Sequence, residues 1–250
     1  MKTITTTVVF DLDDTLYPEK DFVISGFMAV DEWVCAHLGI KGFFQQAQEA
    51  FEQGIRGTIF NTVLDKLAAN RYNQLTINEM IKIYRNHFPK IQLATDAEEI
   101  LKNLKGKKNL AIITDGDLST QKNKGKALDL ENKIDLVVYT DAYGRENWKP
   151  SKLPYEKVMD HFHVKGSECV YIGDNPSKDF KGANELGWLT VRLRRPQSLH
   201  RLIEAPSPEF APKLEINSLS LVDWGNCFWS PKSVPPPPLR KRGNCAKGNF

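Results

Sequence analysis

The 250-residue sequence lacks the marks of several protein classes. Its four cysteines, Cys35, Cys169, Cys227 and Cys245, form no CxxC pair and have no histidine cluster beside them, which argues against a zinc site or a disulfide framework. The longest apolar candidate, residues 22–40, is interrupted by acids and is too polar to cross a membrane. The N-terminus has no signal-peptide pattern. We therefore expect a cytoplasmic protein with no membrane partner.

Most of the chain also lacks a net excess of positive or negative charge. The formal net charge is +3, but five of the 34 lysines and arginines fall in the last twenty residues, which contain no acid. The rest of the chain therefore sets 29 basic against 31 acidic residues. This balance gives no electrostatic reason to expect nucleic-acid binding.

A short stretch near the N-terminus combines a buried strand with a group of acids. The apolar residues 8–10, two of them β-branched valines, predict a strand, and Asp11, Asp13 and Asp14 lie within the four residues after it. In open α/β sheets, ligands bind where the strands end. Two carboxylates that converge there repel each other unless a cation or a proton intervenes. The alternative interpretation is an acidic loop that only caps the next helix.

The remaining pattern predicts an α/β fold with a helical insertion. Residues 18–92 show helical periodicity and no strand pattern, whereas strands and helices alternate from residue 95 to 195, which is typical of a Rossmann-like parallel sheet. We expect a core made of residues 1–17 and 93–223, with residues 18–92 as a small helical domain. Residues 224–250, rich in Pro and Gly, are expected to form a disordered tail or a proline-rich docking segment.

Further polar residues follow the other predicted strands of the core. Thr114 ends one strand, Lys149 lies in the loop after the next, and Asp174 and Asp179 follow the one after that. The ends of parallel strands share one edge of a sheet, so we expect these residues to meet Asp11 and Asp13. Carboxylates suit Mg²⁺, while lysine and threonine suit phosphoryl oxygens. The combination indicates phosphoryl transfer.

In order along the chain, these residues match the four motifs of a known family. The chain resembles the haloacid dehalogenase-like (HAD) hydrolases through the sequence from Asp11 to Leu16, then Thr114, Lys149 before Pro150, and the stretch from Gly173 to Asp179. The resemblance covers about residues 4–195. It implies a Rossmann-like core, and it identifies the helical insertion as the family's C1 cap, which closes over the site and selects the substrate.

The resemblance also implies a role for each motif residue. Asp11 resembles the nucleophile and a metal ligand, while Asp13 resembles the general acid and base and would bind Mg²⁺ through its backbone carbonyl. Asp174 resembles the remaining direct metal ligand, and Asp179 would act less directly or through water. The phosphoryl group would be held by Thr114 and Lys149, and Thr15 would order the loop after the first strand and so belong to the substrate site.

The carboxylate at Asp13 favours one reaction within the family. Family members that displace halide lack an acid there, whereas a phosphomonoesterase must protonate a poor leaving alcohol. We therefore expect a Mg²⁺-dependent phosphatase for a small phosphorylated metabolite such as a sugar phosphate, a nucleoside monophosphate or phosphoglycolate. Two alternatives stay open: a phosphomutase of the same family, and a non-enzymatic phospho-accepting receiver, whose acceptor would lie near Asp141. The sequence predicts no particular oligomeric state.

Residues near the motifs are assigned structural or surface roles. Asp115, where relatives often have asparagine, is expected to point away from the phosphate site. Asp14 is expected to serve the local turn, and Lys124 and Lys178 are expected to face solvent. The same surface or structural role is predicted for every histidine, namely His37, His87, His161, His163 and His200.

Overall fold

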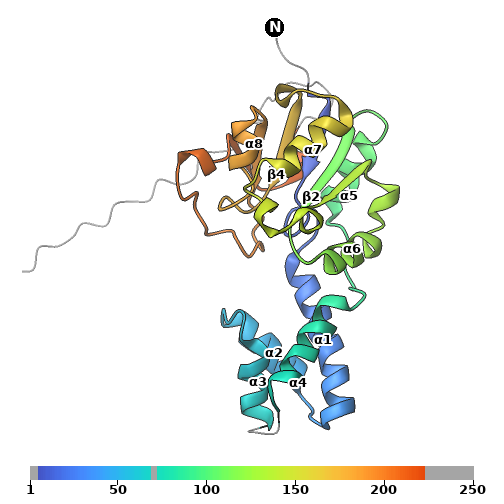
Figure 1. Cartoon of the computed structure of the whole chain (residues 1–250), viewed down its shortest axis with the longest axis vertical. Helices are drawn as coiled ribbons and strands as arrows, with labels where there is room; N and C mark the ends of the chain where they lie inside the picture. The colour runs from blue at the N-terminus through green and yellow to red at the C-terminus, as the bar shows by residue number, and fades with distance from the viewer. Residues whose placement is uncertain (1–4, 69–71, 223–250) are drawn as a thin grey trace, which may run out of the picture.

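One parallel sheet organises the molecule (Figure 1). The computed structural model describes residues 5–68 and 72–222. Within these ranges six strands form the sheet in the order β3-β2-β1-β4-β5-β6, and every neighbouring pair is parallel. The predicted α/β class is therefore confirmed. The predicted tail at residues 224–250 lies outside the described residues.

The strands and helices have the following bounds. The strands are β1 Thr7–Phe10, β2 Asn109–Thr114, β3 Leu136–Tyr139, β4 Cys169–Gly173, β5 Leu189–Leu193 and β6 Leu214–Ile216. The helices are α1 Glu19–Leu38, α2 Phe43–Glu52, α3 Ile59–Ala68, α4 Gln74–Asn86, α5 Thr95–Leu104, α6 Leu118–Ala127, α7 Leu153–Phe162 and α8 Lys181–Glu185. Single 3-10 turns are η1 Leu130–Asn132, η2 Thr140–Tyr143, η3 Arg145–Asn147, η4 Gly166–Glu168, η5 Pro208–Phe210 and η6 Leu219–Leu221.

The central strand β1 is buried on both faces, as its apolar sequence predicts. Val8 and Phe10 point into one apolar cluster and Val9 into another, because successive strand side chains point to opposite faces. The first cluster includes Leu101 of α5, and the second includes Tyr155 of α7. Helices therefore cover both faces of the sheet, and only the strand ends are left for polar residues.

The helices α1–α4 have an apolar core of their own, separate from the two clusters on the sheet. Figure 1 shows them as a unit beyond one end of the sheet, reached through α1 and left through α4. Helix α4 begins at Gln74, where Asn73 caps it: Asn73 Oδ1 accepts from the Thr76 backbone N–H at 3.1 Å. No helix in the described part of the chain has the length and apolar character that a membrane span requires.

The helical unit is fastened to the sheet layer near the start of α6. Thr120 Oγ1 donates to the Arg85 carbonyl at 3.0 Å, and Asn123 Nδ2 donates to the Asn86 carbonyl at 3.0 Å. On the other side of the insertion, the Ala94 backbone N–H donates to the Leu16 carbonyl at 2.9 Å. These bonds hold the unit over the same edge of the sheet at which β1 and β2 end.

Arg195 ties the loop after β1 to the start of α5. Its guanidinium donates to both carboxylate oxygens of Asp96, at 2.7 and 3.1 Å, and to the Thr15 carbonyl at 3.1 Å. Asp96 also accepts from Ser218 Oγ and from the Leu219 N–H, each at 2.9 Å. Burial alone would raise the pKa of Asp96, but the Arg195 bonds and the other donors hold it below its usual range.

We expect Asp96→Asn to lower the free energy of unfolding near pH 7 by about 2 kcal/mol, because a charge-assisted pair is lost. A carboxylate with a depressed folded-state pKa stabilises the fold above its unfolded pKa of about 3.9, and this contribution disappears as the pH falls through the folded-state value. The difference between the two proteins should therefore shrink below about pH 4 in urea unfolding. The exposed Asp160→Asn is the control, and a difference that is constant down to about pH 3 would contradict the assignment.

Candidate active site

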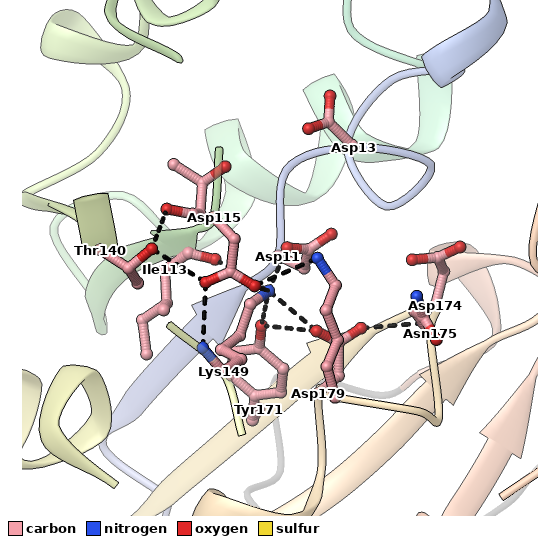
Figure 2. Close-up of polar contacts among 12 residues, drawn as sticks. Asp11, Asp13, Ile113, Asp115, Thr140, Lys149, Tyr171, Asp174, Asn175 and Asp179 are labelled. Carbon is pink, nitrogen blue, oxygen red and sulfur yellow. Dashed lines mark hydrogen bonds and ion pairs between the residues drawn. The ribbon is translucent and has the colours of Figure 1, made fainter. Parts of the chain in front are cut away.

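Four polar residues lie where adjacent strands end. Asp11 directly follows β1, Thr114 is the last residue of β2, and Asp174 directly follows β4. Because β2, β1 and β4 are neighbours, their ends form one edge, and Lys149 reaches it from the loop after β3. Figure 2 shows Asp11, Lys149, Asp174 and Asp179 gathered there from segments far apart in the chain.

Lys149 occupies the centre of the cluster. Its side chain has no exposed surface, and its Nζ donates to Asp11 Oδ1 at 2.5 Å and to Asp179 Oδ1 at 2.8 Å (Figure 2). The same Nζ lies 3.0 Å from the Tyr171 hydroxyl. Burial would lower the pKa of Lys149, but the charges of Asp11 and Asp179 outweigh it and hold the pKa well above its ordinary value. Lys149 is therefore a fixed positive charge.

Burial and the neighbouring carboxylates raise the pKa of Asp11. Burial is the largest cause, the charges of Asp179 and Asp174 add to it, and Lys149 and Lys178 act in the opposite direction, giving a pKa of about 8. One ammonium group next to Asp11 thus does not offset its burial and its acidic neighbours. More positive charge at this spot would favour the carboxylate form of Asp11.

Asp11, Asp174 and Asp179 form a group that fits a divalent cation. All three are buried, and one carboxylate oxygen from each lies within 4.8 Å of the others. Buried acids without enough counter-charge and an all-oxygen donor set are what Mg²⁺ requires. Asp179, expected to act less directly or through water, places one carboxylate oxygen within 4.8 Å of an oxygen of each of the other two acids.

The side chain of Asp13 lies apart from this group. Figure 2 shows its carboxylate pointing away from Asp11. Its Oδ1 accepts from Lys124 Nζ at 2.7 Å and from the Tyr17 hydroxyl, and Gln121 Nε2 lies 3.3 Å from its Oδ2. Burial would raise the pKa of Asp13, but Lys124 and the hydrogen bonds hold it below its usual value.

Asp14 has the local role that the sequence predicts. Its backbone adopts a φ of 56°, in the left-handed region that aspartate tolerates in turns. Its side chain accepts from the Glu19 N–H at 2.9 Å and from the Leu199 N–H at 2.6 Å. Asp14 therefore joins the start of α1 to the segment after β5, and it lies outside the group formed by Asp11, Asp174 and Asp179.

Two threonine hydroxyls near the edge have no partner. Thr114 Oγ1 and Thr15 Oγ1 are buried and make no hydrogen bond within the described residues. An unsatisfied buried hydroxyl costs about 1–3 kcal/mol. An anionic ligand bound at the end of β2 would accept a hydrogen bond from Thr114 Oγ1 and remove this cost.

Two expectations about the loop charges were wrong. Asp115 does not point aside: its Oδ1 accepts from the Lys149 backbone N–H at 3.1 Å and from Thr140 Oγ1 at 2.9 Å. Lys178 does not simply face solvent, because its Nζ donates to Asp115 Oδ2 at 3.1 Å. The two lysines outweigh burial and hold the pKa of Asp115 low, so the added carboxylate is tolerated. Lys178 sits inside the fourth motif, and this was the sequence signal for its position.

Lys124 was misassigned to the surface, and His200, expected to be structural or on the surface, contacts an acid of the cluster. The Lys124 side chain is only 4% exposed because it turns toward Asp13 and lies over the Phe22 ring, 4.2 Å from its centre. His200 Nδ1 lies 3.1 Å from Asp174 Oδ2, which also accepts from Ser198 Oγ at 2.8 Å. The hydrogen bond with Asp174 raises the pKa of His200. No motif marks Lys124 or His200, since their partners lie 111 and 26 positions away.

A cavity of about 430 Å³ opens over the cluster. Both acids and bases line it, and this mixed wall can bind an anion beside a cation. The lining residues are Asp11, Asp13, Glu19, Asp115, Gly116, Gln121, Lys124, Trp148, Lys149, Asp174, Asn175, Lys178 and His200.

Known phosphatases and HAD hydrolases are similar to this chain. A glyceraldehyde 3-phosphate phosphatase of Methanocaldococcus jannaschii is 31% identical over 196 residues, which cover 74% of this chain and 83% of that protein. A ribulose-1,5-bisphosphate 5-phosphatase of Halopiger xanaduensis is 25% identical over 210 residues and covers the same shares. The magnesium-bound HAD hydrolase YfnB of Bacillus subtilis has a similar fold, with a TM-score of 0.61, 20% identity and coverage of 87% of this chain and 96% of that one. The sequence model of the haloacid dehalogenase-like hydrolases matches residues 8–192, and the chain belongs to this family.

Proposed function

We propose that the protein is a Mg²⁺-dependent phosphatase that hydrolyses a small phosphorylated metabolite through a phosphorylated Asp11. The observation that carries this proposal is the buried Lys149, bonded to Asp11 and Asp179 beside a third acid, Asp174, at the floor of a cavity. Two similar proteins named as phosphatases of phosphorylated sugars support the substrate class. The substrate candidates are sugar phosphates, nucleoside monophosphates and phosphoglycolate.

The metal would be held by the carboxylates of Asp11, Asp174 and Asp179, together with the backbone carbonyl of Asp13. When bound, Mg²⁺ supplies positive charge that offsets the repulsion among these acids and between Asp11 and the phosphate. The Lys149 ammonium and the Thr114 hydroxyl bind the phosphoryl oxygens, and Thr15 orders the loop that carries Asp13. His200 and Ser198 keep the Asp174 carboxylate oriented.

In the first step, an Asp11 carboxylate oxygen attacks phosphorus and the bond from phosphorus to the leaving oxygen breaks. Asp13, turned from Lys124 toward the substrate and protonated, gives its proton to that oxygen, so that a neutral alcohol leaves. Lys149 stays charged throughout, because its neighbours hold its pKa high, and it stabilises the phosphoryl oxygens as negative charge shifts among them.

In the second step, Asp13, now a carboxylate, accepts a proton from water as the water oxygen attacks phosphorus. The bond between phosphorus and Asp11 breaks, inorganic phosphate is released, and the Asp11 carboxylate is restored. This leaves the proton on Asp13, as the first step of the next turnover requires. Lys124 and Tyr17 contact the Asp13 side chain when it is turned away from the substrate.

The two alternatives are weaker. A phosphomutase would use Asp11 and Asp13 in the same way but would return the phosphoryl group to a sugar, and it would release isomerised sugar phosphate without free phosphate. A receiver would carry its acceptor near Asp141, but Asp141 Oδ2 accepts from the Leu118 N–H at 3.0 Å at the start of α6. That carboxylate already has a structural partner.

We expect phosphate release from a panel of sugar phosphates, nucleoside monophosphates, phosphoglycolate and p-nitrophenyl phosphate to require Mg²⁺. Chelation should abolish it and added Mg²⁺ should restore it, since three acids depend on the cation. Asp174→Asn should lower kcat/KM by about 100-fold or more at fixed Mg²⁺. The measurement is inorganic phosphate released per unit time.

The control for this experiment is Asp160→Asn, an exposed carboxylate on α7. Product analysis of a hexose phosphate tells the phosphatase from the mutase in the same assay. No metal-dependent phosphate release from any compound, the aryl phosphate included, would count against the proposal.

We expect Asp13→Asn to reduce kcat/KM unequally for different leaving groups. For alkyl phosphates the loss should be about 10²- to 10⁴-fold, because the leaving alkoxide needs the Asp13 proton. For p-nitrophenyl phosphate the loss should be much smaller, since nitrophenolate leaves without protonation. Equal losses for both classes, in steady-state kinetics with Mg²⁺, would show that Asp13 is not the general acid.

A further inference from the structure

A second cavity of about 530 Å³ lies beside the first, within the helical unit. Its wall is formed by α1, α3 and α4, by the end of α2 and the loop that follows it, and by one residue of the segment after β5. Most of its lining is apolar or aromatic, including Phe27, Phe51, Phe60, Ile81, Tyr84 and Leu199. A cavity of this size is in the range that takes a whole small-molecule ligand.

Glu19 joins the two cavities. It lines both of them, so the two cavities are adjacent at this residue. Within the described residues, the Glu19 carboxylate has no hydrogen bond and no ion pair, although its backbone N–H is bonded to Asp14 at 2.9 Å. Burial and the nearby charge of Asp13 raise the pKa of Glu19 to about 7. A carboxyl group in this position can accept hydrogen bonds from hydroxyl groups on a ligand.

Tyr84 stands next to Glu19 on the wall of the second cavity. Its ring packs edge-on against Phe60, with centres 5.8 Å apart, and it contacts Phe27 as well. Burial and the charges of Glu19 and Asp13 raise the pKa of its hydroxyl, so the hydroxyl stays neutral near these acids. The wall therefore changes from a hydrogen-bond acceptor at Glu19 to flat aromatic surface at Tyr84 and Phe60.

Two arginines line the same cavity. Arg56 lies over the Phe51 ring, 3.7 Å from its centre, and donates to the carbonyls of Phe51 and Ile55 at 2.7 and 2.8 Å. These contacts fix the plane of its guanidinium. Arg85 lines the cavity from the last turn of α4. Together they supply donors for oxygen atoms on a ligand that has passed Glu19.

We propose that the second cavity binds the alcohol part of the substrate, and that the substrate is a phosphomonoester of a large alcohol. This alcohol carries hydroxyl groups next to the phosphate, for Glu19, and a flat ring with oxygen substituents beyond them, for Tyr84, Phe60 and the arginines. A nucleoside 5′-monophosphate has this layout. A three-carbon alcohol would leave most of the apolar wall in water. The inference rests on the proposed function for the site at Asp11.

The test is a comparison of four ligands that separates hydroxyl groups from the ring. Uridine 5′-monophosphate has both, glucose 6-phosphate has hydroxyls only, p-nitrophenyl phosphate has a ring only, and glycerol 3-phosphate is small. Kd is measured by calorimetry with Mg²⁺ in an Asp11→Asn background, so that no turnover occurs. We expect uridine 5′-monophosphate to bind at least about tenfold more tightly than each of the others.

Two variants in that background locate the binding site. Asn61→Trp adds bulk to the wall of the second cavity without removing a core side chain. It should raise the Kd of uridine 5′-monophosphate by a factor at least about tenfold larger than that for glycerol 3-phosphate. Lys66→Trp, exposed on the same helix, is the matched control and should leave both unchanged. Glu19→Gln should weaken the binding of uridine 5′-monophosphate and glucose 6-phosphate more than the binding of p-nitrophenyl phosphate.

Equal affinity for ligands with and without the ring, or an Asn61→Trp variant that behaves like Lys66→Trp, would overturn the inference. Turnover of p-nitrophenyl phosphate by the unsubstituted chain is measured separately and decides the proposed function. If the chain hydrolyses the aryl phosphate but binds all four ligands with equal affinity, the proposed function stands and the inference about the second cavity is wrong. A chain without turnover fails the proposed function, while the Kd values still decide what the second cavity binds.

Discussion

Mutual repulsion among buried carboxylates is the constraint on which this structure depends. Asp11, Asp174 and Asp179 place oxygens within 4.8 Å of one another. Two unit charges about 4 Å apart repel by about 4 kcal/mol at an effective dielectric constant near 20, a large part of the 5–15 kcal/mol that usually stabilises a domain. The Lys149 ammonium offsets part of this repulsion, and its burial makes the compensation permanent. Because the pKa of Asp11 stays raised beside Lys149, a further positive charge nearby would favour its carboxylate form.

The segments around the cluster are organised to hold it against that repulsion. Arg192 of β5 donates hydrogen bonds to the Asp174 carbonyl and to the His200 and Ile203 carbonyls of the segment after β5. This segment in turn brings His200 to Asp174 and the Leu199 N–H to Asp14. Leu199 then lines the second cavity while His200 lines the first. One short stretch of chain thus links the orientation of a metal-group acid to the shape of the space in the helical unit.

Sequence patterns predicted the sheet and the gathering of its strand-end residues, because both follow from local periodicity and from the geometry of parallel strands. The same reasoning missed Lys124, Lys178 and His200. The two lysines were assigned to the surface, and the histidine to a structural or surface role, from their own neighbourhoods in the sequence. Each contacts a carboxylate that only the fold brings close. Asp115 was misjudged for the same reason, since the two lysines that make its charge tolerable come from other loops. Contacts between distant segments leave no local pattern, and motifs reveal only those that a whole family shares.

The most direct test of the account is the rate at which Asp11→Asn releases phosphate from p-nitrophenyl phosphate in the presence of Mg²⁺, relative to the unsubstituted chain. Asparagine keeps the shape of the side chain and removes the nucleophilic carboxylate. If Asp11 attacks phosphorus, the rate should fall by about 10³-fold or more. A variant that folds with the same thermal stability and retains more than about a tenth of the rate would show that another group, or water directly, attacks the phosphate.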